Sequence, residues 1–439
     1  MKLNLRFPSR EIYTCLRKVD VSDYLPIVEH PIMLSLEEKS QLSFVYKVFP
    51  GGKHSRYEHS LFVYHFTDEV NKHLYEKGCI DEEQMNDTKI ASLLHDVGHG
   101  PFSHYVERIL GFFINPKEPL THEKMGMELL KSKEVDREGR TIRECIEECG
   151  GNFERIVKIV GKEAKEASII SHHTLGTDKC AYTLVDAHHT GYLIDKPYFL
   201  DLFKHVIYFD GEMGILALRD IISQTQRLQT LIQEMYTNVY YNEKVVRFGR
   251  LMEKALEREI RIEKLDPREV WRMNEGALIY RLENSKDRDV RELIKRYRRN
   301  ELYETALQFR IESYAHEKNS IPIDKNFARK LTKKFMNRIN LTSLEERISE
   351  VTKIPWVDIL VTLSADPERI VPEDVNLYSV EDNSVKKIGT LFNSYPLHHS
   401  SLLEKSEDFF ALRVAVTPKM RDKILSKRES IKEIVTEMV

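Results

Sequence analysis

The sequence lacks several features that mark whole classes of protein. No apolar run approaches the roughly 18 residues that cross a bilayer, and residues 1–8 have no continuous apolar core of the signal-peptide kind. The five cysteines are scattered and odd in number, which argues against a disulfide scaffold. These absences predict a cytoplasmic protein with reduced thiols and no membrane partner.

The sequence also lacks a large excess of positive or negative charge, and it contains few glycines and prolines. Lysine and arginine number 67 against 70 aspartates and glutamates, and the net charge of −3 excludes a strongly basic nucleic-acid binder. The exception is Lys286–Arg299, with seven basic and three acidic residues. Such a run is typical of a solvated helix face, and nucleic-acid contact is the alternative. Only 18 glycines and 15 prolines interrupt 439 residues, which favours a mainly α-helical fold.

Hydrophobic spacing predicts helices through much of the chain. The expected helices are Tyr57–Leu74, Ile90–Asp96, Glu154–Ser171, Lys179–Leu193, Ile215–Arg261 and Pro267–Ala315. Asp87 or Thr88 is the expected cap of the second of these. After about residue 340, β-rich runs follow at Trp356–Ser364, Val375–Val380, Val385–Leu391 and Phe409–Thr417, before a final helix from Pro418. The pattern predicts a mainly α fold with a small α+β C-terminal domain.

Four residues form a candidate metal site: His59, the adjacent pair His95 and Asp96, and Asp178. Imidazole nitrogens and carboxylates make a mixed donor set that suits Mn²⁺, Mg²⁺, Fe²⁺, Zn²⁺ or Ni²⁺. Adjacent residues diverge by about 100° within a helix, but at a helix end both can face one ion. Taken alone, His59 reads as a core histidine and Asp178 as a helix N-cap. Their conjunction with a His-Asp pair favours metal-assisted hydrolysis.

Longer motifs around these residues resemble the HD-domain metal-dependent phosphohydrolases, and among them the deoxynucleoside triphosphate (dNTP) triphosphohydrolase branch. The motifs are QLSFVYKVFPGGKHSRYEHSL (Gln41–Leu61), LLHDVGHGPFSH (Leu93–His104), THE (Thr121–Glu123) and TDKCAYTLVDAHHTG (Thr177–Gly191). The resemblance implies a helical HD catalytic domain over residues 1–245, with its motifs in 41–191. A helical extension over residues 246–339 and the small α+β domain over 340–439 complete the expected organisation.

The resemblance implies a role for each motif residue. Residues implied to bind the metal are His59, His95, Asp96 and Asp178. Residues implied to bind substrate are Gln41, Leu42, Arg56, Lys179, Tyr182, Asp186 and Tyr240. The implied catalytic group is His99, His104, His122 and Glu123. In this scheme Arg56 and Lys179 contact phosphate, and His104 is the general acid.

Some of these assignments have support or alternatives in the residues themselves. Lys179, Tyr182 and Asp186 fall at i, i+3 and i+7, which is one face of a helix. Core aromatics are the alternative for Tyr182 and Tyr240. The pair at 122–123 also reads as a helix start with an acidic first turn.

The implied reaction converts a dNTP to a deoxynucleoside and tripolyphosphate by attack of metal-activated water. Two alternatives stay open: hydrolysis of another phosphoester, such as a nucleoside monophosphate or cyclic nucleotide, and a non-catalytic nucleotide-binding sensor. Retention of His104 and His122 argues against the sensor. The resemblance further implies a nucleotide substrate, nucleotide activators and a homo-oligomer, either a dimer or a tetramer.

The motifs also depart from the family's pattern. Where the family carries Asp-Tyr and Arg-Asp pairs after the last metal residue, this sequence has Ala181-Tyr182 and Val185-Asp186. The metal residues match fully and the triphosphate contacts match in part. Base preference, metal identity and the choice between deoxynucleotides and ribonucleotides therefore stay open.

Overall fold

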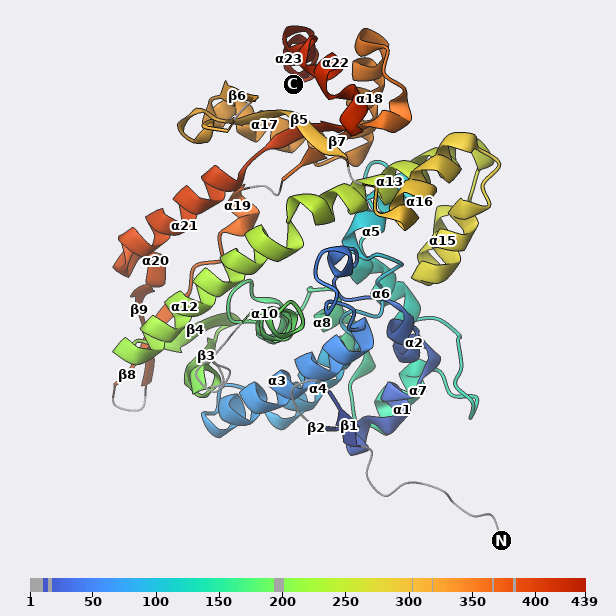
Figure 1. The fold of residues 1–439 in the computed structure, drawn as a ribbon. Coiled ribbons are helices and arrows are strands. Elements are labelled where there is room, and N and C mark those ends of the chain that lie inside the picture. The colour runs from blue at the N-terminus through green and yellow to red at the C-terminus, as the bar shows by residue number, and fades with distance from the viewer. Residues whose placement is uncertain are drawn as a thin grey trace.

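A computed structural model describes residues 11–14, 18–192, 201–301, 303–317, 319–364, 367–381 and 384–439 (Figure 1). Cys15 and Leu193, both part of sequence predictions, lie outside the described residues. The described chain is mainly helical with small sheets of mixed strands toward the C-terminus, which confirms the predicted fold class. No described helix combines the length and the apolar character needed to cross a membrane.

The first half of the chain is a cluster of helices. Its elements are β1 (Glu11–Tyr13), β2 (Lys18–Asp20), α1 (Leu25–Val28), α2 (Pro31–Leu34), α3 (Arg56–Glu76), α4 (Glu82–Leu94), α5 (His104–Ile114), α6 (His122–Leu130), α7 (Ile142–Glu148), α8 (Phe153–Val160), α9 (Ala167–Ser171) and α10 (Thr177–His189). Short 3₁₀ turns are η1 (Ser22–Tyr24), η2 (Ser35–Glu38) and η3 (Val45–Lys47). In Figure 1 the green helix α10 lies between the blue helix α3 and the yellow-green helix α12 (Arg219–Met235).

The second half mixes long helices with strands. Its elements are η4 (Phe203–His205), β3 (Val206–Phe209), β4 (Glu212–Leu216), α12 (Arg219–Met235), the π-helix η5 (Tyr236–Tyr240), α13 (Glu243–Glu263), α14 (Pro267–Arg272), α15 (Glu275–Glu283), α16 (Arg288–Arg299), β5 (Glu304–Ile311), η6 (Glu312–Tyr314), β6 (Ser320–Ile323), α17 (Lys325–Phe335) and α18 (Arg338–Thr352). There follow η7 (Trp356–Asp358), β7 (Ile359–Leu363), α19 (Pro367–Ile370), β8 (Asn376–Glu381), β9 (Ser384–Thr390), α20 (Leu391–Ser394), α21 (Pro396–Phe409), β10 (Leu412–Val416), η8 (Pro418–Met420), α22 (Arg421–Leu425) and α23 (Arg428–Glu437). The long pair α12 and α13 crosses the molecule between the helical half and the C-terminal sheet (Figure 1).

Two four-stranded sheets tie distant parts of the sequence together. One has the order β6-β5-β10-β7, and the other has the order β3-β4-β8-β9. In the second, β4 pairs in parallel with β8, with Ile215 opposite Leu377. The chain beyond residue 370 thus returns to the helical half, beside the helices that carry the candidate site.

Several predicted helix boundaries were wrong. Glu154–Ser171 is two helices, α8 and α9, because the backbone turns to a positive φ of 60° at Lys162. The cap of α4 is Asp81 rather than Asp87 or Thr88, since its carboxylate accepts the Gln84 amide hydrogen in a capping box.

The long predicted helices were also wrong in part. Ile215–Arg261 begins as strand β4 and is interrupted by η5 between α12 and α13. Pro267–Ala315 contains three helices and then the strand β5, whose last six residues are all buried. A strand buried on both faces lacks the polar–apolar alternation that sequence reading relies on.

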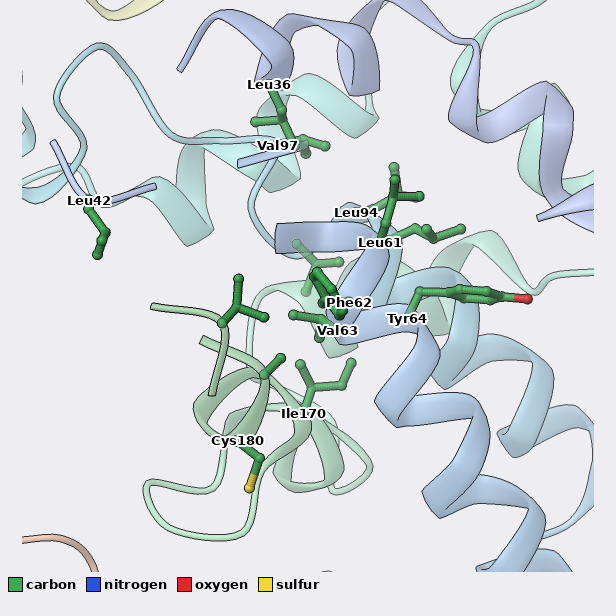
Figure 2. Packing of buried hydrophobic residues seen from close by; sticks show 14 of the residues in the cluster. Leu36, Leu42, Leu61, Phe62, Val63, Tyr64, Leu94, Val97, Ile170 and Cys180 are labelled. Atoms are coloured by element: carbon green, nitrogen blue, oxygen red, sulfur yellow. The ribbon is translucent and has the colours of Figure 1, made fainter. Parts of the chain in front are cut away.

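Buried apolar residues form two clusters. The larger one extends through the helical half and holds α3, α4, α9 and α10 together. Figure 2 shows its part near the candidate site, with Phe62 and Val63 of α3 lying close to Leu94 of α4 and Ile170 of α9. The smaller cluster fills the space between the sheet containing β5 and the helices α17, α18 and α23. The larger cluster therefore fixes the helix ends from which the site residues project.

Candidate metal centre

The structure brings the four predicted metal residues together. His59 lies in the first turn of α3, Asp178 in the first turn of α10, and His95 and Asp96 directly after α4. Nε2 of His59 lies 3.0 Å from Oδ1 of Asp178 and 3.5 Å from Oδ2 of Asp96. Nε2 of His95 lies 3.6 Å and 3.4 Å from the nearest oxygens of the same two carboxylates.

Local structure explains why adjacent residues face one point. Helix α4 ends at Leu94, so the side chains of His95 and Asp96 need not diverge as those of neighbouring residues within a helix do. Nδ1 of His95 lies 2.8 Å from the carbonyl oxygen of Ser92, which directs Nε2 toward the carboxylates. The following Gly98 is required, since a Cβ there would lie 1.9 Å from the carbonyl oxygen of His122.

The donor set fits a divalent cation. One donor atom each from His59, His95 and Asp178 lies within 4.8 Å of the others. Nε2 of His95 is buried and makes no hydrogen bond to the residues that the structure describes. Burial would lower the pKa of His95, but the carboxylates of Asp96 and Asp178 raise it to about 9. A bound cation would satisfy both the unpaired nitrogen and the two carboxylates.

Arg56 lies against these residues rather than free in solvent. Its Nη1 lies 2.5 Å from Oδ2 of Asp96, and its Nε donates to Oγ of Ser103 at 2.7 Å. Burial would raise the pKa of Asp96, but Arg56 and the nearby imidazoles hold it well below its usual range. Arg56 therefore keeps Asp96 ionised and holds its orientation.

A second cluster contains three of the four predicted catalytic residues and one that sequence reading missed. Oε2 of Glu107, a residue of α5, lies 3.2 Å from Nδ1 of His104 and 3.1 Å from Nδ1 of His122. His99 stacks on His122 with ring centroids 3.9 Å apart. The fourth predicted residue, Glu123, lies 3.3 Å from Nε2 of His122. The sequence signal for Glu107 is its position three residues after His104.

The electrostatics of this cluster favour an ionised Glu107 beside a protonated His122, whereas burial lowers the pKa of His104. Burial would raise the pKa of Glu107, but His122 and His104 hold it well below the ordinary value. Burial would lower the pKa of His122, but Glu107 raises it. His104 has 57% of its side chain exposed, so it lies at the opening of the cluster.

The predicted substrate residues of α10 lie in a group of tyrosines. Nζ of Lys179 donates to the hydroxyl of Tyr182 and, at 3.0 Å, to that of Tyr236. Tyr240 donates to Oδ2 of Asp186 at 2.8 Å. Residues 236 and 240 both lie in the π-helix η5 and face α10. Such π-helical turns are frequent at functional sites. Sequence reading missed Tyr236, although it lies four residues before the predicted Tyr240.

The segment before α3 completes this region. His54 was also missed in the sequence analysis. Its Nε2 lies 2.9 Å from Oδ1 of Asp186, and its ring stacks on that of His189. The predicted Leu42 is buried, and Oε1 of the predicted Gln41 is buried without a hydrogen bond to any described residue. Gln41 is held through its backbone, whose N–H donates to the carbonyl oxygen of His54.

A small cavity of about 40 Å³ lies beside the metal residues. Its lining includes His95, Asp96 and Asp178 on one side and His122 with Glu123 on another. A volume of this size accommodates water molecules or phosphoryl oxygens and is too small for a nucleoside.

Comparisons with known proteins agree with this arrangement. Residues 56–189 match the model of the HD domain family, and residues 232–371 match that of the HD associated region. An uncharacterised protein of Methanocaldococcus jannaschii, MJ1154, is 28% identical over 83% of this chain and 70% of its own length. The bovine deoxynucleoside triphosphate triphosphohydrolase SAMHD1 is 38% identical over 22% of this chain and only 17% of its own length.

Two solved structures share the fold. A phosphohydrolase from Bacteroides thetaiotaomicron has a TM-score of 0.66 and 18% identity, covering 93% of this chain and 99% of that one. A hypothetical protein from Aquifex aeolicus has a TM-score of 0.65 and 22% identity, covering 95% and 99%.

The helical fold and the His/Asp cluster at its helix ends define a phosphohydrolase of the metal-dependent kind. Residues 56–189 and 232–371 therefore belong to the HD-domain superfamily, as an HD domain followed by an HD associated region. Within that superfamily, the matched part of the HD domain resembles the dNTP triphosphohydrolase branch.

Proposed function

We propose that this protein hydrolyses nucleoside triphosphates, and specifically dNTPs, to a deoxynucleoside and tripolyphosphate. One observation carries the proposal: α10 presents metal, phosphate and sugar candidates along one side. Asp178 lies at the metal residues, Lys179 and Tyr182 follow, and Asp186 lies two turns further on. Eight residues of helix span about 12 Å, which suits a nucleotide lying along the helix with its phosphate at the metal end.

His59, His95, Asp96 and Asp178 would hold the metal. When bound there, a divalent ion supplies an activated water and neutralises phosphate charge. Manganese, magnesium, iron, zinc and nickel all accept this donor set. Asp96 needs its charge for this role, and the contact with Arg56 preserves that charge.

The residues of the chain supply the remaining chemistry. Water adds to the α-phosphorus, the bond to the 5′ oxygen breaks, and Nε2 of His104 donates a proton to that oxygen. Glu107 accepts the hydrogen bond from Nδ1 of His104 and so directs the ring. His99, His122 and Glu123 would form the polar surroundings of this proton donor.

Lys179 and Arg56 would stabilise charge on the phosphate oxygens. At the other end, Asp186 and Tyr240 would contact the sugar, with Gln41 and Leu42 facing it across the site. Buried Gln41 Oε1 has no hydrogen bond to the described residues, which supports a polar contact with substrate.

A second candidate is hydrolysis of a smaller phosphoester, such as a nucleoside monophosphate. The observation that favours it is that both side chains proposed to bind phosphate are already bonded to other groups of the protein. Arg56 is bonded to Asp96 and Ser103, and Lys179 to two tyrosines. A triphosphate would have to replace several of these bonds, whereas a monophosphate would not.

Assembly and location are part of the same proposal. We expect a homo-oligomer, a dimer or tetramer, that responds to nucleotide activators and works in the cytoplasm. Nucleic acid is the less favoured partner because the basic helix α16 uses several arginines internally. Arg298 pairs with Glu283, Arg296 with Glu292, and Arg291 donates to the carbonyl oxygen of Ser285.

Product analysis tests the proposed reaction. Each dNTP and rNTP is incubated with Mn²⁺ or Mg²⁺, singly and in mixtures, and products are separated by anion-exchange and reverse-phase chromatography. Tripolyphosphate with free deoxynucleoside, absent from a His95→Ala control, is the expected result. Release of orthophosphate from a monophosphate alone would overturn the first candidate in favour of the second.

A further inference from the structure

Lys162 occupies a position at the site that neither the motifs nor the proposed reaction uses. The cavity beside the metal residues is lined by eleven described residues, and Lys162 is the only lysine or arginine among them. The others include His95, Asp96 and Asp178, so this ammonium group shares the cavity with the proposed metal residues.

The turn after α8 places Lys162 at the cavity. Helix α8 ends at Val160, and Lys162 adopts a φ of +60°, a conformation that residues other than glycine rarely adopt. The N–H of Lys162 still donates to the carbonyl oxygen of Ile159 at 3.0 Å, which fixes the turn. The N–H of Glu163 also donates to the carbonyl oxygen of Lys158, so the positive φ belongs to a Schellman helix end that holds Lys162 at the cavity.

The present partner of Lys162 is easily exchanged. Nζ lies 2.8 Å from Oε1 of Glu123, and half of the lysine side chain is exposed. Exposed ion pairs contribute little to stability, so an incoming anion can replace Glu123 at small cost. After Glu123, the next attractions on this ammonium come from Asp178 and Asp96. An oxygen bound between those carboxylates and the cavity therefore lies within its electrostatic reach.

The cavity size indicates what the ammonium would meet. About 40 Å³ accommodates phosphoryl oxygens but not a sugar or base. The nucleoside end of a substrate would therefore point along α10 toward Asp186, away from Lys162.

We propose that Lys162 is a substrate-binding residue that exchanges Glu123 for a non-bridging oxygen of the phosphoryl group held at the metal residues. This inference rests on the proposed function for the site but not on the identity of the nucleoside. It adds a cation to a phosphate site in which Arg56 and Lys179 are largely occupied by protein partners.

The test measures binding of inorganic tripolyphosphate to Mn²⁺-loaded protein by isothermal titration calorimetry, together with KM and kcat. Lys162→Met should weaken binding tenfold or more, because a charge-assisted hydrogen bond is lost. Lys162→Gly should lose as much while relieving the positive φ, which separates charge from folding. Lys162→Arg should retain most of the affinity.

Lys165→Met is the matched control. Lys165 lies three residues further in the same loop, is 71% exposed, and pairs with Asp210 instead of lining the cavity. The Lys165→Met variant should bind tripolyphosphate with the same affinity as the unaltered protein. If the Lys162→Met and Lys162→Gly variants bind tripolyphosphate as tightly as the unaltered protein, or if the Lys165→Met control loses as much affinity as they do, the inference is overturned.

The outcomes also separate this inference from the proposed function. If the protein binds tripolyphosphate through Lys162 but hydrolyses no nucleoside triphosphate, the inference stands and the dNTP proposal fails. If dNTPs are hydrolysed and the Lys162 variants bind and react unchanged, the inference alone fails.

Discussion

Replacing Glu107 with glutamine tests the second cluster directly, because the change removes one charge and almost no volume. Oε2 of Glu107 lies 3.2 Å from Nδ1 of the proposed proton donor, His104. A hydrogen bond to a charged group contributes about 1.5–3 kcal/mol. Loss of that amount from the transition state lowers kcat between roughly tenfold and 150-fold. Since His104 is 57% exposed, water replaces part of the bond, and the lower half of this range is expected.

The assay compares two leaving groups. In the proposed reaction the deoxynucleoside leaves through its 5′ oxygen as a poorly stabilised alkoxide and needs a proton, whereas the 4-nitrophenolate of a 4-nitrophenyl phosphate ester leaves without one. If Glu107 acts by holding the proton donor, Glu107→Gln slows the nucleotide reaction and nearly spares the nitrophenyl reaction. Metal content and the far-UV circular dichroism spectrum should stay unchanged, because Glu107 is outside the proposed metal set.

Glu118→Gln provides the control for this experiment. Glu118 pairs with Lys124 near the same helices but is 71% exposed, and it should affect neither reaction. An equal loss on both leaving groups for Glu107→Gln would refute the assignment of Glu107 to the proton donor. The carboxylate would then act on the phosphate site as a whole.

Three further changes probe the metal, the packing and a buried charge. His95→Ala should reduce bound Mn²⁺ from about one per chain to near zero, as measured by mass spectrometry of dialysed protein. Gly98→Ala should destabilise the fold by at least about 1–3 kcal/mol in urea unfolding, since its Cβ meets backbone at 1.9 Å. Gly126→Ala, whose Cβ meets only ordinary contacts, should be neutral or stabilising. Burial lowers the pKa of Lys254 to about 8, against about 10.4 unfolded, so the unfolded chain holds more protons between these pH values. The free energy of unfolding should therefore rise by about 3 kcal/mol across that range relative to Lys254→Met, and an equal pH dependence in both proteins would contradict this.

The candidate metal residues could be singled out from sequence because their evidence is local. A His-Asp pair followed, after Val97, by Gly-His-Gly indicates a helix end, and the structure has α4 ending at Leu94 as that pattern requires. The helices α3 and α10 were also predictable, since their apolar spacing is regular and their packing follows from it. The sequence did not predict how the three helix ends that carry these residues meet in space.

Other parts of the site depend on contacts that sequence spacing does not reveal. Glu107 is an ordinary acidic residue of an amphipathic helix until α6 brings His122 against it from fifteen residues away. Tyr236 faces Lys179 and Tyr240 faces Asp186 from η5, a π-helix whose turn is wider than the 3.6 residues on which helical periodicity relies. The strand β5 was predicted as helix because its buried residues show no alternation.

The HD associated region contributes directly to the geometry of the metal centre. Trp271 of α14 donates from Nε1 to the carbonyl oxygen of Gly98 at 2.7 Å, which fastens the turn after Asp96. On the other side, just beyond the matched region, Glu373 accepts the N–H of His173 at 3.0 Å through its carboxylate. Its carbonyl oxygen also accepts the hydroxyl hydrogen of Thr174 at 2.6 Å, in the loop that leads into α10.

Two of the three helix ends that carry the proposed metal residues, the end of α4 and the start of α10, are thus held by chain from outside residues 56–189. Metal residues need to be held within a few tenths of an ångström, and loop backbones hold such positions only when other groups fix them. The return of the chain through β8 onto β4 brings Glu373 to this loop, so the second sheet supports the site as well as the fold. The HD motif therefore indicates which residues meet, and the chain beyond it, through Trp271 of the associated region and Glu373 just after that region, fixes the turns beside them.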